Sequence, residues 1–233
     1  MLEVKGLNAW YGESHILHGV DYEVREGEVV TLLGRNGAGK TTTLKSIMGL
    51  VPRREGSIQF RGREMINAMP NHVARAGIAF CPEERGIFGS LSVTENLMLP
   101  PVVAPGGLGI DEIYTLFPNL RERAHTAHGT RLSGGEQQML AIGRILRTGA
   151  KLLLLDEPTA GMAHGDVDRI VELIKSIRKG RTILMVEHNL SVVEGLCDTI
   201  TVLTRGKVLA EGTYETVSKN PEVIAAYLGT ADA

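Results

Sequence analysis

One segment, Gly34-Arg35-Asn36-Gly37-Ala38-Gly39-Lys40-Thr41, limits more than any other what this chain can fold into. It fits G-x-x-x-x-G-K-[ST] at every fixed position, and it follows the short apolar run EVVTLL at 28–33. Glycines let such a loop curl with its backbone N–H groups pointing inward at phosphate oxygens, and the dipole of the following helix faces the same anion. The segment therefore predicts a buried strand, a phosphate-binding loop and a helix that continues to about residue 48.

The loop also predicts which groups hold a nucleotide and its metal. Lys40 is expected to reach the β- and γ-phosphates of ATP, and the Thr41 hydroxyl to ligate Mg²⁺. The predicted nucleotide-binding residues of this loop are Gly34, Arg35, Asn36, Gly37, Ala38, Gly39, Lys40, Thr41 and Thr42.

A second apolar run, KLLLL at 151–155, ends in two adjacent carboxylates. Ligands of open α/β sheets bind at the carboxyl ends of the strands, so these side chains are expected at the nucleotide. Adjacent residues on a strand point to opposite sides, which lets one carboxylate face a metal and the other a water molecule. We therefore predict that Asp156 holds Mg²⁺, through water, and that Glu157 is the catalytic base.

The rest of the chain alternates short apolar strands with helices, which indicates a parallel sheet in a single domain over residues 1–233. Residues 1–33 read as strands. Prolines and glycines interrupt the pattern after residue 87, and residues 87–146 are predicted to form a mainly helical insert. Further strands are expected at 56–61, 77–81, 151–155 and 182–186, helices at 166–177 and 191–196, and a hairpin at 199–203 and 207–210.

Charge and composition narrow the class of protein. The net charge of −2 gives no basic excess, so no nucleic-acid partner is expected. Cys81 and Cys197 lack metal-ligand spacing and are expected to be reduced thiols. The N-terminus lacks the apolar core of a signal peptide, and no apolar run approaches the ~20 residues that span a bilayer. These features predict a cytoplasmic protein without its own membrane anchor.

The segment LSGGEQQ at 132–138 distinguishes between kinds of P-loop ATPase. A serine followed by two glycines at the start of a helix exposes a hydroxyl and unobstructed N–H groups, which favours an anion. The segment resembles the signature of the ATP-binding cassette (ABC) ATPases, and the resemblance covers essentially the whole chain. It implies an α/β P-loop NTPase core with an N-terminal antiparallel β subdomain and an inserted helical subdomain. It also implies a dimer in which Ser133, Gly134, Gly135 and Glu136 address the γ-phosphate held by the other subunit.

The resemblance implies three further site residues. His188, after the strand at 182–186, matches the histidine that contacts the γ-phosphate and the attacking water. Tyr11 matches the aromatic residue that stacks on adenine, although neighbouring Trp10 leaves the register open. Glu83 stands where many relatives have glutamine, and it could approach Mg²⁺ or the water as a carboxylate.

Some segments resemble one branch of the family, the importers of hydrophobic (branched-chain) amino acids. These segments are PEER at 82–85 with the following GIFGSLSVTENL, HILHGV at 15–20, and LFPNL at 116–120. The loop at 158–164, PTAGMAH, lacks the S-x-L-D pattern of many relatives, so its contacts with a second subunit stay open. Which of the two ATPases of such an importer this chain resembles also stays open.

The resemblance implies a subunit that hydrolyses ATP and drives transmembrane permease subunits at the cytoplasmic face of the inner membrane, as a peripheral protein. Its partners would be a second ABC ATPase in a homo- or heterodimer and, indirectly, a periplasmic solute-binding protein. The alternative is an ABC exporter subunit, for instance of a lipid-extraction system. Soluble ABC ATPases of DNA repair or ribosomes are disfavoured, since the chain has neither a long coiled-coil insertion nor a second cassette. A non-hydrolysing module is disfavoured because Glu157 and His188 are both present.

Overall fold

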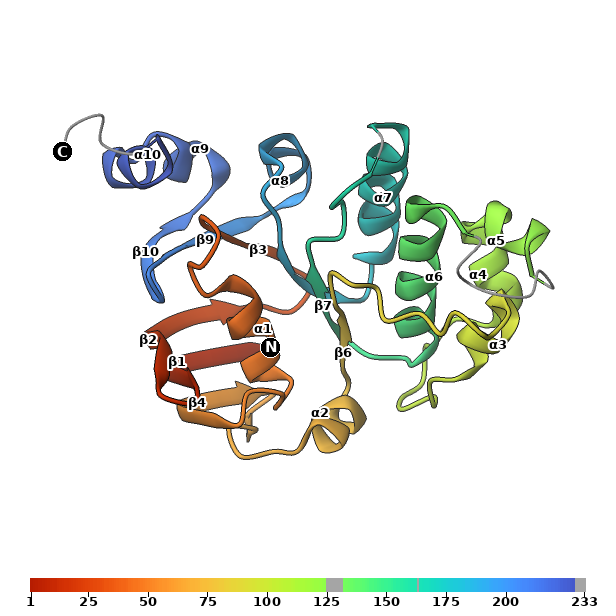
Figure 1. The fold of residues 1–233 in the computed structure, drawn as a ribbon, viewed down its shortest axis with the longest axis horizontal. Helices are drawn as coiled ribbons and strands as arrows, with labels where there is room; N and C mark the ends of the chain where they lie inside the picture. Colours follow the sequence, from red (N-terminus) through yellow and green to blue (C-terminus); the bar gives the residue numbers. More distant parts are fainter. Residues whose placement is uncertain (125–131, 163, 229–233) are drawn as a thin grey trace.

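The computed structural model describes residues 1–124, 132–162 and 164–228, and within them two sheets are surrounded by helices (Figure 1). The strands are β1 (Leu2–Tyr11), β2 (Ser14–Val24), β3 (Val29–Leu33), β4 (Arg53–Phe60), β5 (Arg63–Glu64), β6 (Ile78–Cys81), β7 (Leu152–Asp156), β8 (Thr182–Val186), β9 (Thr199–Thr204) and β10 (Lys207–Gly212). The helices are α1 (Lys40–Ile47), α2 (Pro70–Ala76), α3 (Val93–Met98), α4 (Ile110–Leu116), α5 (Pro118–Glu122), α6 (Gly134–Arg147), α7 (His164–Ile177), α8 (Leu190–Leu196), α9 (Tyr214–Ser218) and α10 (Pro221–Leu228).

The larger sheet has the order β10-β9-β3-β8-β7-β6 and is parallel from β9 to β6. Strands β3, β7 and β8 are buried along their whole length, because both faces of this sheet are covered. The smaller sheet, β2-β1-β4-β5, is antiparallel. The predicted α/β core with an N-terminal antiparallel subdomain is confirmed.

The parallel sheet separates two hydrophobic cores. Leu153 and Leu155 of β7 pack with residues of α3 to α7, while Leu152 and Leu154 pack with α1 and the antiparallel sheet. This division follows from the alternation of side chains along a strand. Each strand of the sheet that carries a site residue is thus fixed on both faces.

The helices α3 to α6 lie between β6 and β7 in the chain and form one end of the molecule (Figure 1). Ser92 and Ser133 begin α3 and α6 with capping boxes, in which each serine accepts a hydrogen bond from the third backbone N–H of its helix. The helical character expected for 87–146 is present in the described residues. The limits of the insert as a subdomain stay a prediction.

Some elements were not predicted, and several predicted limits were shifted. Helix α2 is short and runs between Pro70 at its first turn and Gly77, a left-handed C-cap with φ of 105°. The helices α9 and α10 follow the predicted hairpin. The strand expected at 56–61 begins earlier, at Arg53, and the helix expected at 166–177 begins at His164.

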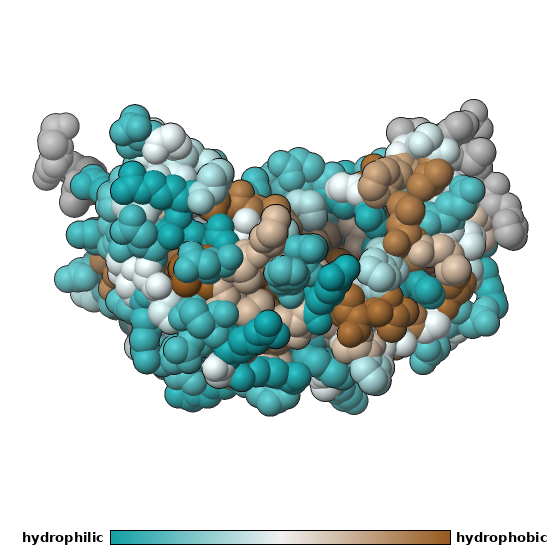
Figure 2. Space-filling model, turned by 90° about the horizontal axis from the view of Figure 1, so that it is seen from below, coloured by the Kyte–Doolittle hydropathy of each residue, from teal (hydrophilic) through white to brown (hydrophobic). Residues whose placement is uncertain are grey.

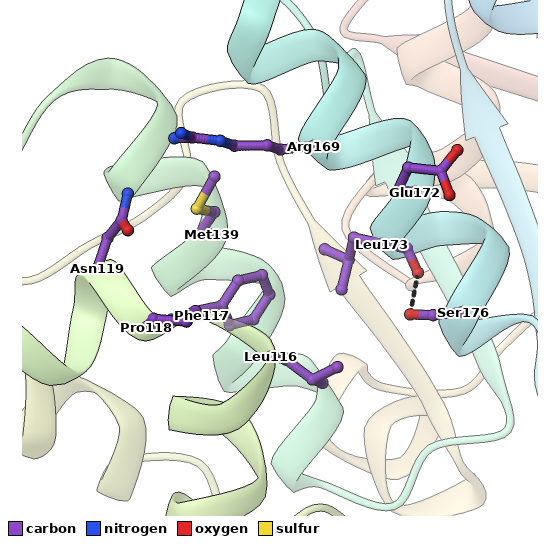
Figure 3. Close-up of a pocket in the computed structure, with 9 residues that line it drawn as sticks. All are labelled: Leu116, Phe117, Pro118, Asn119, Met139, Arg169, Glu172, Leu173 and Ser176. Atoms are coloured by element: carbon purple, nitrogen blue, oxygen red, sulfur yellow. Dashed lines mark hydrogen bonds between the residues drawn. The ribbon is translucent and has the colours of Figure 1, made fainter.

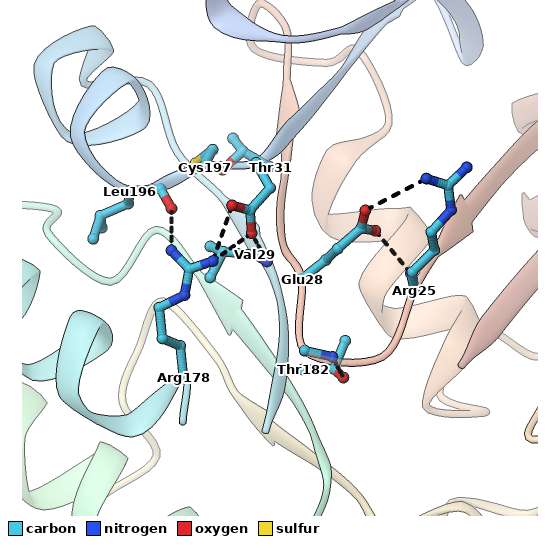
Figure 4. Close-up of polar contacts among 10 residues, drawn as sticks. Arg25, Glu28, Val29, Thr31, Arg178, Thr182, Leu196 and Cys197 are labelled. Carbon is cyan, nitrogen blue, oxygen red and sulfur yellow. Dashed lines mark hydrogen bonds and ion pairs between the residues drawn. The ribbon is translucent and has the colours of Figure 1, made fainter. Parts of the chain in front are cut away.

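Polar contacts fix the amino ends of the parallel strands, opposite the edge that carries the predicted site (Figure 4). Asp198, before β9, accepts a hydrogen bond from Val29 N at 2.8 Å and hydrogen bonds from Arg178 Nη2 at 2.9 and 2.6 Å. The Thr182 hydroxyl oxygen accepts a bond from Gly27 N at 2.9 Å. These contacts join β3, β8 and β9 at that edge and stabilise the sheet from which the site loops extend.

Candidate functional site: a phosphate pocket at the carboxyl edge of the sheet

Four loops meet at the carboxyl ends of β3, β8, β7 and β6, which are neighbours in the sheet. They carry the phosphate loop, His188, the pair Asp156 and Glu157, and Glu83. A hollow of about 450 Å³ lies there and is lined by Ile16, Asn36, Gly37, Ala38, Gly39, Lys40, Thr41, Thr42, Glu83 and Glu157. The structure therefore brings together most of the predicted nucleotide-binding residues with two of the predicted carboxylates. Ile16 was not predicted.

The loop from Gly34 to Gly39 adopts backbone conformations that require glycine. Gly39 has φ of 104°, and a Cβ atom there would lie 2.6 Å from Leu17 Cδ2. A Cβ atom on Gly34 would overlap the carbonyl oxygen of Leu203. The loop is thus packed tightly against β2 and β9, as a pre-formed cradle for phosphate requires.

The Lys40 side chain lies along this loop, where Nζ donates hydrogen bonds to Gly34 O at 2.8 Å and Arg35 O at 3.3 Å. Burial lowers the pKa of the Lys40 amine, and the negative charges of Glu157, Asp156 and Glu83 oppose that shift. Its ammonium group is placed to meet an anion in the hollow.

The turn between β9 and β10 contacts the phosphate loop and supports it. Gly206 N donates to Ala38 O at 3.0 Å, and Gly206 O accepts from His18 N at 2.8 Å. Gly206 has φ of 75°, and a Cβ atom there would overlap the carbonyl oxygen of Ile16. The hairpin was predicted, but its contact with the phosphate loop was not.

The predicted metal residues Thr41 and Asp156 are in contact, since the Thr41 hydroxyl donates to Asp156 Oδ1 at 3.0 Å. Asp156 is buried, and burial raises the pKa of its carboxyl to about 6, with nearby Glu157 and Glu83 adding to the shift. The described residues hold no group of three or more His, Cys, Asp or Glu side chains that could form a metal site by themselves. Mg²⁺ is commonly held by one or two carboxylates together with substrate phosphates, so this hydroxyl and carboxylate fit it.

Glu157 and His188, the predicted catalytic residues, lie side by side. His188 Nδ1 is 3.4 Å from Glu157 Oε2, and Glu157 lines the hollow. Glu157 has φ of 47°, a left-handed conformation that costs free energy for a residue with a side chain. Surrounding contacts must therefore hold this conformation.

The residues Ser133, Gly134, Gly135 and Glu136 lie at the start of α6 and do not line the hollow. The Ser133 hydroxyl accepts from Glu136 N at 3.2 Å, and Glu136 accepts from Ser133 N at 2.7 Å and Arg123 Nε at 3.0 Å. A Cβ atom on Gly135 would lie 2.6 Å from the Asp166 carboxyl group, which explains the glycine there. Within one chain, therefore, this segment and the phosphate loop are not in one site.

Tyr11 is the last residue of β1; its side chain is exposed and does not line the hollow. Its neighbour Trp10 stacks on His15 with ring centroids 4.3 Å apart, and the Arg53 guanidinium lies 4.3 Å from the centre of the Trp10 ring. Trp10 is thus engaged within the chain, and the contact of Tyr11 with adenine stays a prediction.

A second hollow, of about 440 Å³, separates the end of α4 and the start of α5 from α7 (Figure 3). Phe117, Met139 and Leu173 form its apolar part, and Arg169 and Glu172 extend from α7 along its side (Figure 3). None of the predicted site residues lines it. It lies between the helical insert and the core and is separate from the phosphate pocket.

A phosphate loop and two carboxylates at the carboxyl edge of a parallel sheet define a P-loop nucleotide-binding protein. A family model described as ABC transporter matches residues 17–160, and one described as branched-chain amino acid ATP-binding cassette transporter matches residues 207–233. The chain therefore belongs to the ABC transporter ATP-binding family, whose members are ATP-binding and ATP-hydrolysing transporter subunits. In the residues that the structure describes, no helix is long and apolar enough to cross a membrane.

Similar proteins cover nearly the whole chain. The high-affinity branched-chain amino acid transport ATP-binding protein BraG of Pseudomonas aeruginosa is 40% identical over 98% of this chain and 100% of its own length. The lipopolysaccharide export system ATP-binding protein LptB of Escherichia coli is 35% identical over 98% of this chain and 97% of its own length. A solved nucleotide-free ATP-binding cassette of an ABC transporter has a TM-score of 0.85 and 27% identity, covering 98% of this chain and 99% of that one.

Proposed function

We propose that this chain hydrolyses ATP to drive the import of branched-chain amino acids, or a related small solute, through a membrane permease. The observation that carries the hydrolytic part is the placement of Glu157 in the phosphate hollow, beside His188. The import of branched-chain amino acids is supported by the family match at 207–233 and by the similarity to BraG. The similarity to LptB supports the second candidate, an exporter subunit.

In the proposed mechanism, the loop N–H groups and Lys40 bind the β- and γ-phosphates of ATP. Thr41 and Asp156 would hold Mg²⁺, with Glu83 near enough to contribute its charge. Bound magnesium neutralises phosphate charge. Glu157 accepts the proton of the attacking water, and His188, in contact with Glu157, orients the water and the γ-phosphate.

A second subunit completes the site in this proposal. Since the segment from Ser133 to Glu136 lies apart from the hollow of its own chain, it is free to face the γ-phosphate of a partner. Its helix N-terminus and glycine N–H groups suit an anion. The partner is either a second copy of this chain or a related ABC ATPase.

The permease partner is proposed to dock on the helical insert from the cytoplasmic face of the membrane. Among the described residues of this part of the chain, five large hydrophobic side chains are exposed: Phe88, Met98, Leu99, Val102 and Leu116. Figure 2 shows hydrophobic residues gathered at the end of the molecule that carries the insert. Exposed apolar clusters of this kind are typical of protein interfaces. A periplasmic solute-binding protein would act through the permease, without touching this chain.

The substitution Glu157→Gln tests the hydrolytic part. The amide keeps the size of the side chain but cannot accept the proton, so the variant should bind MgATP, lose turnover and accumulate as a dimer in size-exclusion chromatography. Glu222→Gln, at an exposed position of α10, is the matched control. Undiminished ATP hydrolysis by Glu157→Gln would remove this residue from the role of base.

Affinity capture of the tagged protein from its native membranes, followed by mass spectrometry, tests the transport part. Co-purification of two permeases, a second ATPase and an amino-acid-binding protein is expected. Recovery of lipid-export components would favour the exporter, without affecting the ATPase chemistry.

A further inference from the structure

A buried carboxylate, Glu187, lies between the loops that carry the two predicted catalytic residues. Its side chain is fully buried at the end of β8, directly before His188. One oxygen, Oε1, accepts hydrogen bonds from the Thr159 backbone N–H at 3.2 Å and from the Thr159 hydroxyl. The other oxygen, Oε2, accepts from His188 N at 3.0 Å and from Asn189 N at 3.1 Å. One side chain thus joins the loop after β7 to the loop after β8.

These contacts lie next to the strained residue of the site. The ladder between β7 and β8 ends with the pair Asp156 and Val186, after which Glu157 turns into its left-handed conformation. Glu157 N donates to Val186 O at 3.0 Å, and two residues further on Thr159 is held by Glu187. Backbone strain of this kind persists only where surrounding contacts fix it. Glu157 is therefore held on both sides, by β8 before it and by Glu187 after it.

We propose that Glu187 is a positioning residue for ATP hydrolysis, because it fixes the Glu157 loop and the His188 loop relative to each other. The 3.4 Å contact between Glu157 Oε2 and His188 Nδ1 depends on the register of these two loops. Glu187 does not line the phosphate hollow, so it acts only through its neighbours. The inference rests on the roles proposed above for Glu157 and His188.

The isosteric substitution Glu187→Gln disturbs this arrangement with the least change in volume. A carboxylate offers two accepting oxygens, whereas the amide offers one oxygen and one donating NH₂ group. Turned toward His188 and Asn189, the NH₂ group meets two backbone N–H donors. Turned toward Thr159, it meets one backbone N–H donor, while the Thr159 hydroxyl can rotate and accept. In either orientation, one of the two loops loses at least one hydrogen bond to residue 187.

A misplacement of catalytic groups by ~1 Å costs up to about 100-fold in rate, so Glu187→Gln should lower kcat about 10- to 100-fold. The affinity for MgATP, measured with a fluorescent nucleotide, should change by less than about 2-fold, because the groups that contact phosphate are unchanged. Thr159→Val removes one donor to Glu187 and should lower kcat by less, whereas Thr159→Ser keeps the hydroxyl and should restore it. The control Glu194→Gln, at an exposed position of α8, should behave as the unaltered protein.

Steady-state ATPase kinetics and nucleotide titration of the full chain, for all four variants, decide the proposal. It is overturned if kcat of Glu187→Gln stays within about 2-fold, or if nucleotide affinity and kcat fall together. If Glu187→Gln does not fold, the difference between Thr159→Val and Thr159→Ser decides, and equal rates overturn the inference.

The failure of the proposed function gives a different pattern. Full turnover by Glu157→Gln would refute the catalytic role of Glu157 itself. A loss of kcat in Glu187→Gln alongside that result would show that Glu187 acts by another route, which would also overturn the positioning role.

Discussion

Replacing Asp156 by asparagine should stabilise the nucleotide-free protein, although the same change removes a predicted metal ligand. Burial raises the pKa of the Asp156 carboxyl from its ordinary 3.8 to about 6, so keeping it ionised costs free energy in the folded state. A shift of this size corresponds to about 3 kcal/mol at neutral pH, as an upper limit. Asparagine avoids that cost and still offers Oδ1 to the Thr41 hydroxyl, which donates to this position at 3.0 Å.

The sign of the pH dependence follows from the same shift. Between pH 3.8 and about 6 the folded state binds more protons than the unfolded state, so this carboxyl makes stability fall as pH rises through that window. Above about pH 6 the cost is constant, and below about pH 4 it vanishes. The advantage of Asp156→Asn should therefore be small near pH 4 and reach its full size near pH 7.

Thermal unfolding without nucleotide at pH 5 and pH 8, with urea unfolding at both values, measures this effect. For a chain of this size, ~3 kcal/mol corresponds to a Tm increase of roughly 6–12 °C at pH 8. The same excess of MgATP should then raise the Tm of the unaltered protein more than that of the variant, because the stabilisation by a ligand grows with the logarithm of its affinity. A variant that is equally or less stable than the unaltered protein at pH 8 would refute the reasoning, as would an advantage that is the same at pH 5 and pH 8.

Three further substitutions test the contacts that support the site and its sheet. Gly206→Ala should destabilise the fold by about 2 kcal/mol or more in urea unfolding and should weaken ATP binding. The added Cβ atom on this left-handed residue must move away from Ile16, and the turn then moves away from the phosphate loop. Unchanged ATP affinity would contradict this. Asp198→Ala should lower the free energy of unfolding by about 1–3 kcal/mol, because it leaves Val29 N without its hydrogen-bond acceptor. Arg178→Ala removes only a partly exposed ion pair and should lower it by less than about 1 kcal/mol. Equal losses would show that the ion pair carries the stability.

The features that could be predicted from the sequence depend on contacts close together in the chain. The phosphate loop is one, since its conformation follows from glycine at fixed spacings between a strand and a helix. The carboxylates at the end of β7 are another, because the end of an apolar run marks the carboxyl edge of the sheet. The class of protein and the fold of the core followed from these two features and from the segment at 132–138.

The features that were missed depend on contacts between distant segments. Glu187 reads in the sequence as one more polar residue before a histidine, and its proposed role becomes visible only where Thr159 contacts it from the loop after β7. Gly206 reads as an ordinary hairpin glycine until its backbone meets Ala38. The helices α9 and α10 were missed because each is short, so neither gives a long periodic pattern.

The carboxylates around Lys40 make both the stability of the free protein and its binding of metal and nucleotide depend on pH. The negative charges of Glu83, Asp156 and Glu157 all act on the Lys40 ammonium group, so three carboxylates share one cation at the hollow. Their mutual repulsion contributes to the raised pKa of the Asp156 carboxyl and makes the ionised site costly in the free protein. If Asp156 holds a divalent cation as proposed, the cation offsets this repulsion, and linkage requires that the proton and the cation compete for Asp156. Metal-dependent nucleotide affinity should therefore weaken as pH falls through about 6, while the cost of the Asp156 carboxyl to the stability of the free protein decreases, and the two effects share one carboxylate as their cause.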